Sequence, residues 1–182
     1  MILMTINVIA QTFQSHQLIQ LANEAARFLE ATPKHILPIA SQFMGSGVYA
    51  LYYNGADKDY AGIGNVPIYV GKAVPTGART GSMVRKEEPK LKSRLNEHAR
   101  SIQQASNLKI ADFKCQFMII PVDMSAIIPV VESMLINKYR PIWNTQIDGF
   151  GNHDPGKGRY EQARSAWDRK HPGRKWADKL QS

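Results

Sequence analysis

Two tyrosines of this chain stand in matching three-residue segments, Gly47-Val48-Tyr49 and Tyr69-Val70-Gly71. If both segments are strands, the period-2 alternation of side chains points the two phenols the same way, so both could flank one pocket. A phenol has a pKa near ~10 and is a poor base at neutral pH unless a cation, a metal-bound water or a second base assists it. The alternative is that Tyr49 and Tyr69 only pack, as tyrosines in strands commonly do.

Arg94 and His98 lie four residues apart in a stretch of helical periodicity, so they should emerge side by side on one helix face. A guanidinium offers a fixed fork of donors that can neutralise charge developing on a phosphate in a transition state. An imidazole titrates near neutral pH and can accept a proton from a phenol or from water. The alternatives are a solvated helix charge for Arg94 and a surface or packed residue for His98.

Glu132 shares a predicted helix face with apolar residues such as Ile128 and Leu135. An ionised carboxylate there loses hydration unless it is paired or bound to metal. Hard oxygen ligands favour magnesium or manganese, and because magnesium keeps several waters, one protein carboxylate is enough. We therefore predict that Glu132 is a ligand for Mg²⁺, with Mn²⁺ able to substitute. The alternative is a salt bridge to Arg94 or Lys138.

Three segments that could position these side chains have the composition of strands. Residues 48–53 and a run from near Ile68 enclose a polar loop at 54–65, which predicts an antiparallel pair. Residues 113–119 alternate, which predicts a half-buried third strand. The expected fold class is α+β, with a small antiparallel β-sheet of about three strands flanked by helices.

Helices are predicted in three places around these strands. Apolar residues at helical spacing indicate an amphipathic helix over 13–31 and a second core helix over 125–139 that Pro141 stops. Between them, the helix of the arginine and histidine follows an exposed loop at 74–89 that is rich in charge, Gly and Pro.

The two tyrosine segments, followed in order by the arginine, the histidine, the glutamate and Asn144, resemble the GIY-YIG nuclease superfamily. Val48 and Val70 replace the isoleucines of its name. Three further segments look like the type II restriction endonuclease branch: residues 67–73, 141–144 and 148–153. The resemblance covers about Gly45 to Trp176. It implies a GIY-YIG core and a Mg²⁺-dependent enzyme that hydrolyses DNA.

By this resemblance, the site residues divide metal-assisted hydrolysis among them. Tyr49, helped by His98, would activate the attacking water, and Tyr69 would hold water or phosphate by its hydroxyl. Arg94 would stabilise the pentacovalent phosphorane. Magnesium on Glu132 would stabilise the departing 3′ oxygen, and the products would carry 5′ phosphates.

Two polar residues near the tyrosine segments have further expected roles. By resemblance, Asn144 positions Glu132 or a metal-bound water, although a plain turn role is the alternative. Lys72 follows the second segment directly and could contact phosphate or steady the Tyr49 phenolate. An exposed lysine at a strand end is its alternative.

A Gly-rich run at 149–159 lacks the Gly-Lys-Ser/Thr ending of a nucleotide-binding loop, so we predict that it contacts DNA. Its donors on a flexible backbone suit phosphates or base edges, and a solvated turn is the alternative. With Lys72, the predicted DNA-binding residues are Asn152, His153, Lys157 and Arg159. The stretch from Tyr160 to Trp176 is predicted as a packed helix with a basic outer face.

Length and charge agree with a single domain that binds a polyanion. The 182 residues divide into an N-terminal helical segment (1–44), a catalytic core (45–147) and a DNA-contacting loop with a C-terminal helix (148–182). The net charge is +8, and residues 72–100 and 148–182 supply all of the excess. Nucleic acid is the expected partner.

Cysteine usage and hydropathy indicate the compartment. Cys115 is the single cysteine, which excludes an intrachain disulfide and a cysteine-based zinc finger and fits a reducing compartment. The first ten residues lack the basic region of a signal peptide, and no stretch approaches transmembrane length. We expect a cytoplasmic protein with no membrane partner.

Two nuclease classes fit these features. The first is a type II restriction enzyme, a homodimer that cuts both strands of a short GC-rich palindrome and has a cognate DNA methyltransferase as its genetic partner. The alternative is a structure-specific repair or recombination endonuclease, which usually brings a separate recognition domain. The wide spacing of the site residues implies insertions at 54–65 and 74–89, which could bind DNA or a second subunit.

Overall fold

The structure, a computed structural model, describes residues 15–60, 62–77, 87–156 and 158–181. Its centre is an antiparallel sheet in the order β1-β4-β2-β3. The strands are β1 (His35–Ile36), β2 (Ser46–Tyr53), β3 (Tyr69–Ala73) and β4 (Phe113–Ile120). The predicted α+β class and the three predicted strands are confirmed. The sequence pattern did not predict β1, which adds two residues at the outer edge of β4.

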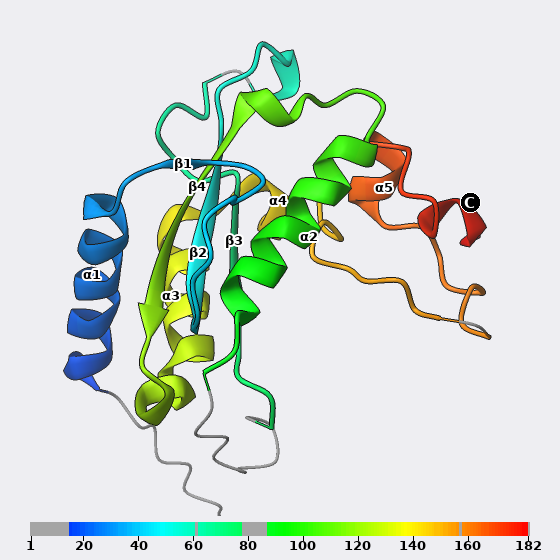
Figure 1. The fold of residues 1–182 in the computed structure, drawn as a ribbon. Coiled ribbons are helices and arrows are strands. Elements are labelled where there is room, and N and C mark those ends of the chain that lie inside the picture. Colours follow the sequence, from blue (N-terminus) through cyan, green and yellow to red (C-terminus); the bar gives the residue numbers. More distant parts are fainter. Residues whose placement is uncertain (1–14, 61, 78–86, 157, 182) are drawn as a thin grey trace, which may run out of the picture.

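Helices cover both faces of the sheet (Figure 1). On one face lie α1 (His16–Ala31) and α3 (Ile128–Tyr139), and on the other lies α2 (Lys90–Gln104). The short helices α4 (Ile142–Thr145) and α5 (Ala166–Lys170) follow. Short 3₁₀ helices lie at Lys58–Tyr60, Ile110–Asp112, Val122–Ile127 and Ala177–Lys179. The predicted N-terminal and central helices are therefore confirmed, with small differences at their ends.

Proline sets the ends of the helices that carry the site. α2 begins directly after Pro89, and α3 has Pro129 in its first turn, where the missing N–H has no intrahelical partner to lose. α3 ends at Tyr139, and the next residue, Arg140, adopts the left-handed conformation (φ 50°) before Pro141. The chain then turns back toward the sheet, which brings α4 against β3.

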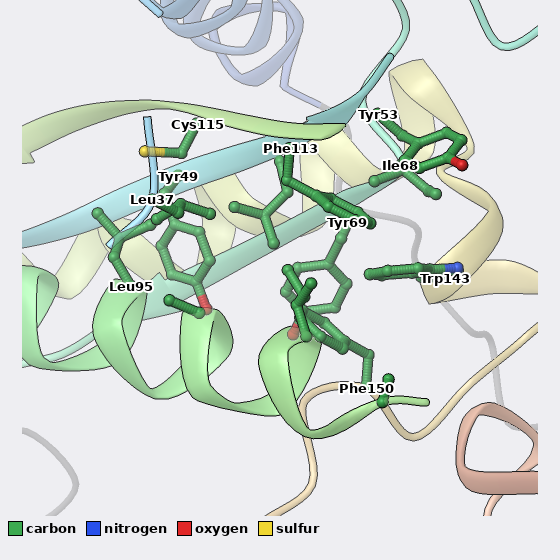
Figure 2. Packing of buried hydrophobic residues seen from close by; sticks show 14 of the residues in the cluster. Leu37, Tyr49, Tyr53, Ile68, Tyr69, Leu95, Phe113, Cys115, Trp143 and Phe150 are labelled. Atoms are coloured by element: carbon green, nitrogen blue, oxygen red, sulfur yellow. The ribbon is translucent and has the colours of Figure 1, made fainter. Parts of the chain in front are cut away.

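Strand β2 alternates between two apolar cores. Tyr49, Leu51 and Tyr53 pack in the core on the α2 side, whereas Val48 and Ala50 pack against α1 and α3. Figure 2 shows the first core, with Tyr49 pointing from the sheet toward α2. Both faces of β2 are therefore buried, and the side of β2 on which a residue falls decides whether it can reach α2.

The prediction of a half-buried third strand is wrong for β4. Cys115 is buried on the α2 side, but Met118 and Ile120 are buried on the other side. The Gln116 amide is also buried and donates to the carbonyls of Glu30 and Thr32. The reason is that α1 and α3 cover the face that was expected to meet solvent.

The prediction of one helix over Tyr160–Trp176 is also wrong. Only the five residues of α5 are helical, because Pro172 cannot continue the helix and Gly173 adopts a positive φ of 135°. A Cβ at Gly173 would lie 1.9 Å from the Gln104 carbonyl oxygen, so the extension packs tightly against the end of α2. Arg174, expected on a basic outer face, is 1% exposed.

Some predictions fall on residues that the structure does not describe. Residues 78–86 of the expected loop and the predicted DNA-binding Lys157 lie outside the described residues. None of the helices in the described ranges is long and apolar enough to cross a membrane.

Candidate active site

A cavity of about 610 Å³ opens beside the edge strand β3, where the two faces of the sheet meet. Tyr69 and Arg94 line it from the α2 side. Glu132 lines it from α3, on the opposite face. Because β3 has no strand beyond it, side chains from both faces reach the same space. The structure thus brings three of the predicted catalytic residues together, and two of the predicted DNA-binding residues, Lys72 and His153, line the same cavity.

Tyr49 and His98 form a buried pair behind this cavity. Tyr49 is 0% exposed, His98 is 2% exposed, and the Tyr49 hydroxyl oxygen lies 2.5 Å from His98 Nε2. Burial, and then the nearby Arg94, lower the pKa of His98 well below its usual range. Burial and then Tyr69 raise the pKa of the Tyr49 phenol well above its usual range. At neutral pH the phenol and the imidazole are therefore both neutral, and they share one hydrogen bond.

Positions 47 and 71 in the two tyrosine segments require glycine, because neighbouring atoms leave no room for a Cβ. A Cβ at Gly71 would lie 2.5 Å from the Tyr49 hydroxyl oxygen and 2.8 Å from Cε1 of Tyr69. A Cβ at Gly47 would lie 2.0 Å from the Met118 carbonyl oxygen of β4. Gly71 pairs with Tyr49 in the sheet, so its missing side chain leaves the space that the Tyr49 ring crosses. The expectation that Tyr49 and Tyr69 share one face is confirmed, with ring centroids 6.2 Å apart.

Hydrogen bonds hold the Arg94 guanidinium at the cavity. Its Nη1 donates to Glu97 Oε2 at 2.9 Å and lies 2.6 Å from His153 Nε2, while Nη2 donates to the Gly151 carbonyl at 2.7 Å. Burial raises the pKa of Tyr69, and the positive charge of Arg94 opposes that rise. The guanidinium therefore faces the cavity in a fixed orientation beside a neutral phenol.

Glu132 forms an ion pair with Lys72 of β3. Sequence analysis gave a salt bridge from Glu132 to Arg94 or Lys138 as the alternative to metal binding. The structure has a salt bridge, but its partner is Lys72. Lys72 pairs with Val48 in the sheet and so lies on the α3 side, away from Tyr49. The suggestion that Lys72 steadies the Tyr49 phenolate is therefore wrong.

Glu132 is the carboxylate that α3 contributes to the cavity. Among the residues that the structure describes, no three His, Cys, Asp or Glu side chains are grouped to hold a metal ion. This donor set does not suit zinc, which takes four protein ligands in structural sites and three in catalytic ones. It suits magnesium, which keeps several waters and needs one or two carboxylates beside the phosphates of a substrate.

The chain matches the family model described as the Eco29kI GIY-YIG domain over residues 41–182, which includes every site residue described above. The chain belongs to this family. It is a family of type II restriction endonucleases, so the chain is a restriction-type endonuclease. The match begins after α1, which leaves that helix outside the matched region. No curated protein matches the chain.

Asn144 supports the GIY-YIG core at its edge strand. Its amide nitrogen donates to the Val70 carbonyl and its amide oxygen accepts from the Val70 N–H, both at 2.8 Å. These are the bonds that a further strand would make, so Asn144 closes the edge of β3 at the residue after Tyr69. Its observed contacts are thus with the backbone that carries Tyr69 rather than with Glu132.

The predicted DNA-contacting loop borders the active site. His153 lines the cavity beside Arg94, and Asn152 and His153 also line an adjoining cavity of about 180 Å³ together with Arg100 and Trp176. Asn152, His153 and Arg159 are exposed. The loop therefore presents polar side chains at the mouth of the site, as a loop that contacts DNA must.

Two groups of this GIY-YIG domain were missed from sequence. Arg174 and Asp168 form a buried ion pair next to the 149–153 loop. His171 is buried and bonds to Tyr60, a residue of the segment expected to be a polar loop. These partners are far apart in sequence and have no regular spacing, so periodicity could not pair them. The one available signal was two aromatic residues, Tyr60 and Trp167, within otherwise polar stretches.

Proposed function

We propose that this GIY-YIG domain is a Mg²⁺-dependent type II restriction endonuclease that cuts both strands of duplex DNA at a specific sequence. The observation that supports it is the cavity of about 610 Å³ beside β3. That cavity joins the carboxylate of Glu132 to the guanidinium of Arg94 and the phenol of Tyr69, whose ring centroid lies 6.2 Å from that of Tyr49 and 5.3 Å from that of His98. A scissile phosphate there would meet a donor fork, a hydroxyl and a carboxylate at once.

The proton of the attacking water would go to the Tyr49–His98 pair. A phenol with a raised pKa is a poor base alone, and Tyr49 is the phenol bonded to a neutral imidazole. As the water oxygen bonds to phosphorus, Tyr49 would accept its proton and pass its own to His98 Nε2. The bond from phosphorus to the 3′ oxygen then breaks, the electron pair leaves with that oxygen, and the phosphate stays on the 5′ end.

The remaining cavity residues would hold the phosphate in position. Tyr69 would donate its hydroxyl to the water or to a phosphate oxygen. Arg94, preorganised by its contact with Gly151, would neutralise the charge that grows on the non-bridging oxygens. Glu132 would hold Mg²⁺, with Mn²⁺ as a substitute, and that ion would supply positive charge for the departing 3′ oxygen. Lys72 would release Glu132 to the metal and contact DNA instead.

The need to cut both DNA strands favours a homodimer. One active site cuts one strand per encounter, so a homodimer whose two-fold axis matches a palindromic site would cut both. We propose a short GC-rich palindrome as the target. A cognate DNA methyltransferase would be required to protect the same site in the host. The second candidate, a structure-specific repair or recombination endonuclease, shares the active site and differs only in its substrate.

Digestion of plasmid DNA with Mg²⁺ separates these candidates. Discrete fragments whose sequenced ends share one short palindrome and carry 5′ phosphates would support the restriction enzyme. Cutting confined to branched or damaged DNA would favour the second candidate. Intact DNA of every kind, with a folded protein and Mg²⁺ present, would exclude both.

The DNA-contacting loop is tested by salt dependence. The variant with both Lys157→Ala and Arg159→Ala should bind specific duplex DNA more weakly. Each lost phosphate contact should also lower the slope of log affinity against log salt by about 0.9. The measurement is fluorescence anisotropy with Ca²⁺ in place of Mg²⁺ over a range of salt concentrations, with Lys114→Ala on the distant strand β4 as the control. An unchanged slope would place the phosphate contacts elsewhere.

A further inference from the structure

We propose that Arg174 is a positioning residue that sets the orientation of the active-site Arg94 through the 149–153 loop. The proposal rests on the proposed function for its effect on cleavage. The structural link itself runs from a buried ion pair in the C-terminal extension, through three backbone carbonyls, to the guanidinium at the cavity.

All three guanidinium nitrogens of Arg174 donate hydrogen bonds within the protein. Nε and Nη2 donate to the two oxygens of Asp168 at 2.6 and 2.7 Å. Nη1 donates to the carbonyl of Phe150 at 3.0 Å and is 3.4 Å from that of Asn152, and Nη2 also donates to that of Gly149 at 3.0 Å. Only a planar fork of donors can hold a carboxylate and three carbonyls together.

The carbonyls that Arg174 holds belong to the loop that holds Arg94. Gly151 lies between them, and its own carbonyl points the other way and accepts from Arg94 Nη2. A Cβ at Gly151 would lie 2.6 Å from the Tyr69 hydroxyl oxygen, so the loop backbone is pressed against the cavity. His153, two residues further on, places Nε2 beside Nη1 of Arg94.

The other side of the pair is fixed as well. Asp168 accepts from the Ser165 hydroxyl at 2.6 Å, and the Ser165 oxygen caps α5 by accepting from the Asp168 N–H. The Arg174 guanidinium lies over the rings of Trp167 and Trp176, at 4.5 and 4.7 Å from their centroids. The Arg174 guanidinium is thus fixed by its carboxylate partner and by two aromatic rings. A residue that positions another side chain must itself be fixed in this way.

A purely structural ion pair is the competing explanation. Buried ion pairs often add little stability compared with apolar residues of the same volume, so their retention needs another reason. An apolar pair could fill this space between the tryptophans, but it could not align the carbonyls of Gly149, Phe150 and Asn152. Those carbonyls determine which way Gly151 points, and so where Arg94 lies.

Arg174→Lys tests the inference, because lysine keeps the charge and loses the fork. We expect the single-turnover cleavage rate at saturating DNA to fall by roughly 10²-fold, the effect of a small misplacement of a catalytic group. DNA affinity and thermal stability should change little by comparison. The matched control is Lys175→Ala at the next, exposed position, which removes a charge from the same segment and should leave the rate unchanged.

A second readout needs no cleavage. Burial, and then the nearby Arg94, lower the pKa of His153, Glu97 opposes the shift, and Arg174 contributes in the same direction as Arg94. Since the lysine variant keeps the charge at position 174, a change in this pKa reports the movement of the loop. NMR titration of His153 in DNA-free protein should therefore give a value closer to the ordinary one in Arg174→Lys, and the wild-type value in Lys175→Ala.

The outcomes separate the inference from the proposed function. Wild-type protein that cuts no DNA would refute the function, while the titration would still decide the link between Arg174 and the loop. An unchanged His153 titration in folded Arg174→Lys would overturn the inference. If Arg174→Lys shows no cooperative melt, Ser165→Ala loosens Asp168 more gently. It should shift the His153 pKa in the same direction, and no shift would likewise overturn the inference.

Discussion

Two buried tyrosine–histidine pairs lie on the α2 side of the sheet, and they differ in what surrounds them. In both Tyr49–His98 and Tyr60–His171 the phenol bonds to Nε2 of a buried imidazole. In both, burial is the main cause that lowers the histidine pKa, to about 4 for His171. Each histidine also packs against aromatic rings, Phe150 for His98 and Trp167 for His171, so local packing does not distinguish the two pairs.

The two pairs differ in the further hydrogen bonds that the phenol and the imidazole make. Tyr60 also accepts from Trp143 Nε1 at 2.9 Å, and His171 Nδ1 donates to Asn107 Oδ1 at 2.9 Å. That pair is closed at both ends and can only hold the 3₁₀ turn of Tyr60 against the C-terminal extension. Tyr49–His98 instead lies beside Arg94 and behind the cavity. A phenol bonded to an imidazole becomes a candidate base only where a substrate can approach and a cation can stabilise charge.

The largest expected effect comes from Glu132, the carboxylate that lines the cavity next to the first pair. Glu132→Gln keeps the shape and removes the ligand charge, so cleavage in Mg²⁺ should be abolished while specific DNA binding persists. Single-turnover cleavage and anisotropy measure the two properties. Glu24→Gln, an exposed carboxylate on α1, is the control and should cut normally. Cleavage by Glu132→Gln near the wild-type rate would show that the metal assignment is wrong.

The pairs themselves are compared by deleting one hydroxyl from each. Tyr49→Phe should slow the cleavage step by roughly 10²–10⁴, the usual range for general acid–base catalysis. Tyr60→Phe should leave cleavage by the folded protein unchanged and lower the free energy of unfolding by about 1–3 kcal/mol, because Trp143 and His171 each lose a partner. Single-turnover cleavage and denaturant unfolding of both variants test whether Tyr49→Phe mainly lowers the cleavage rate and Tyr60→Phe mainly lowers the free energy of unfolding.

A double variant then tests whether Tyr49 and His98 act as a unit. His98→Ala should also slow cleavage, but its loss combined with Tyr49→Phe should be far less than additive. A Tyr49→Phe enzyme that cuts close to the wild-type rate would rule out the phenol as base. Fully additive losses in the double variant would rule out the relay.

Two arrangements around the active pair could be predicted from sequence because their geometry is local, whereas the pairing of Tyr49 with His98, 49 residues apart, was expected only from the family resemblance. Tyr49 and Tyr69 belong to adjacent strands, so period-2 alternation was enough to place them on one face. Arg94 and His98 are four residues apart on one helix, so helical periodicity placed them together. Patterns of this kind depend on nothing beyond the element itself, which is why they held.

The second pair and the Arg174 network could not be found this way. Tyr60 and His171 are 111 residues apart, and each lies in a stretch whose neighbours are mostly polar. Arg174 looked like one of several exposed charges on a helix, but Pro172 and Gly173 end α5 and turn it inward. The partner of Glu132 was missed for a similar reason, since only the β2–β3 register shows that Lys72 faces α3. Contacts that arise when distant segments pack leave no periodic signal.

The last expected effect is confined to acid pH and concerns stability, where the two pairs should behave alike. The pKa of a buried neutral histidine is lower in the folded protein than in the unfolded chain. As pH falls below about 6.5, the unfolded chain therefore binds a proton that the folded protein cannot, and stability is lost. With a folded pKa of about 4, His171 should account for about 3 kcal/mol of this loss by pH 4.

His171→Gln cannot titrate, so its unfolding free energy should fall less steeply between pH 7 and pH 4 than that of the wild type, while cleavage at neutral pH is retained. His98→Gln should show the same flattening and lose cleavage as well, because its imidazole serves both purposes. Denaturant unfolding followed by tryptophan fluorescence across this pH range gives the slopes. If His171→Gln lost stability as steeply as the wild type, His171 would not be buried as a neutral base, and the likeness between the two pairs would fail. If His98→Gln made the unfolding free energy less dependent on pH and still cut DNA, His98 would have no catalytic role. The first pair would then serve only stability, as the second does.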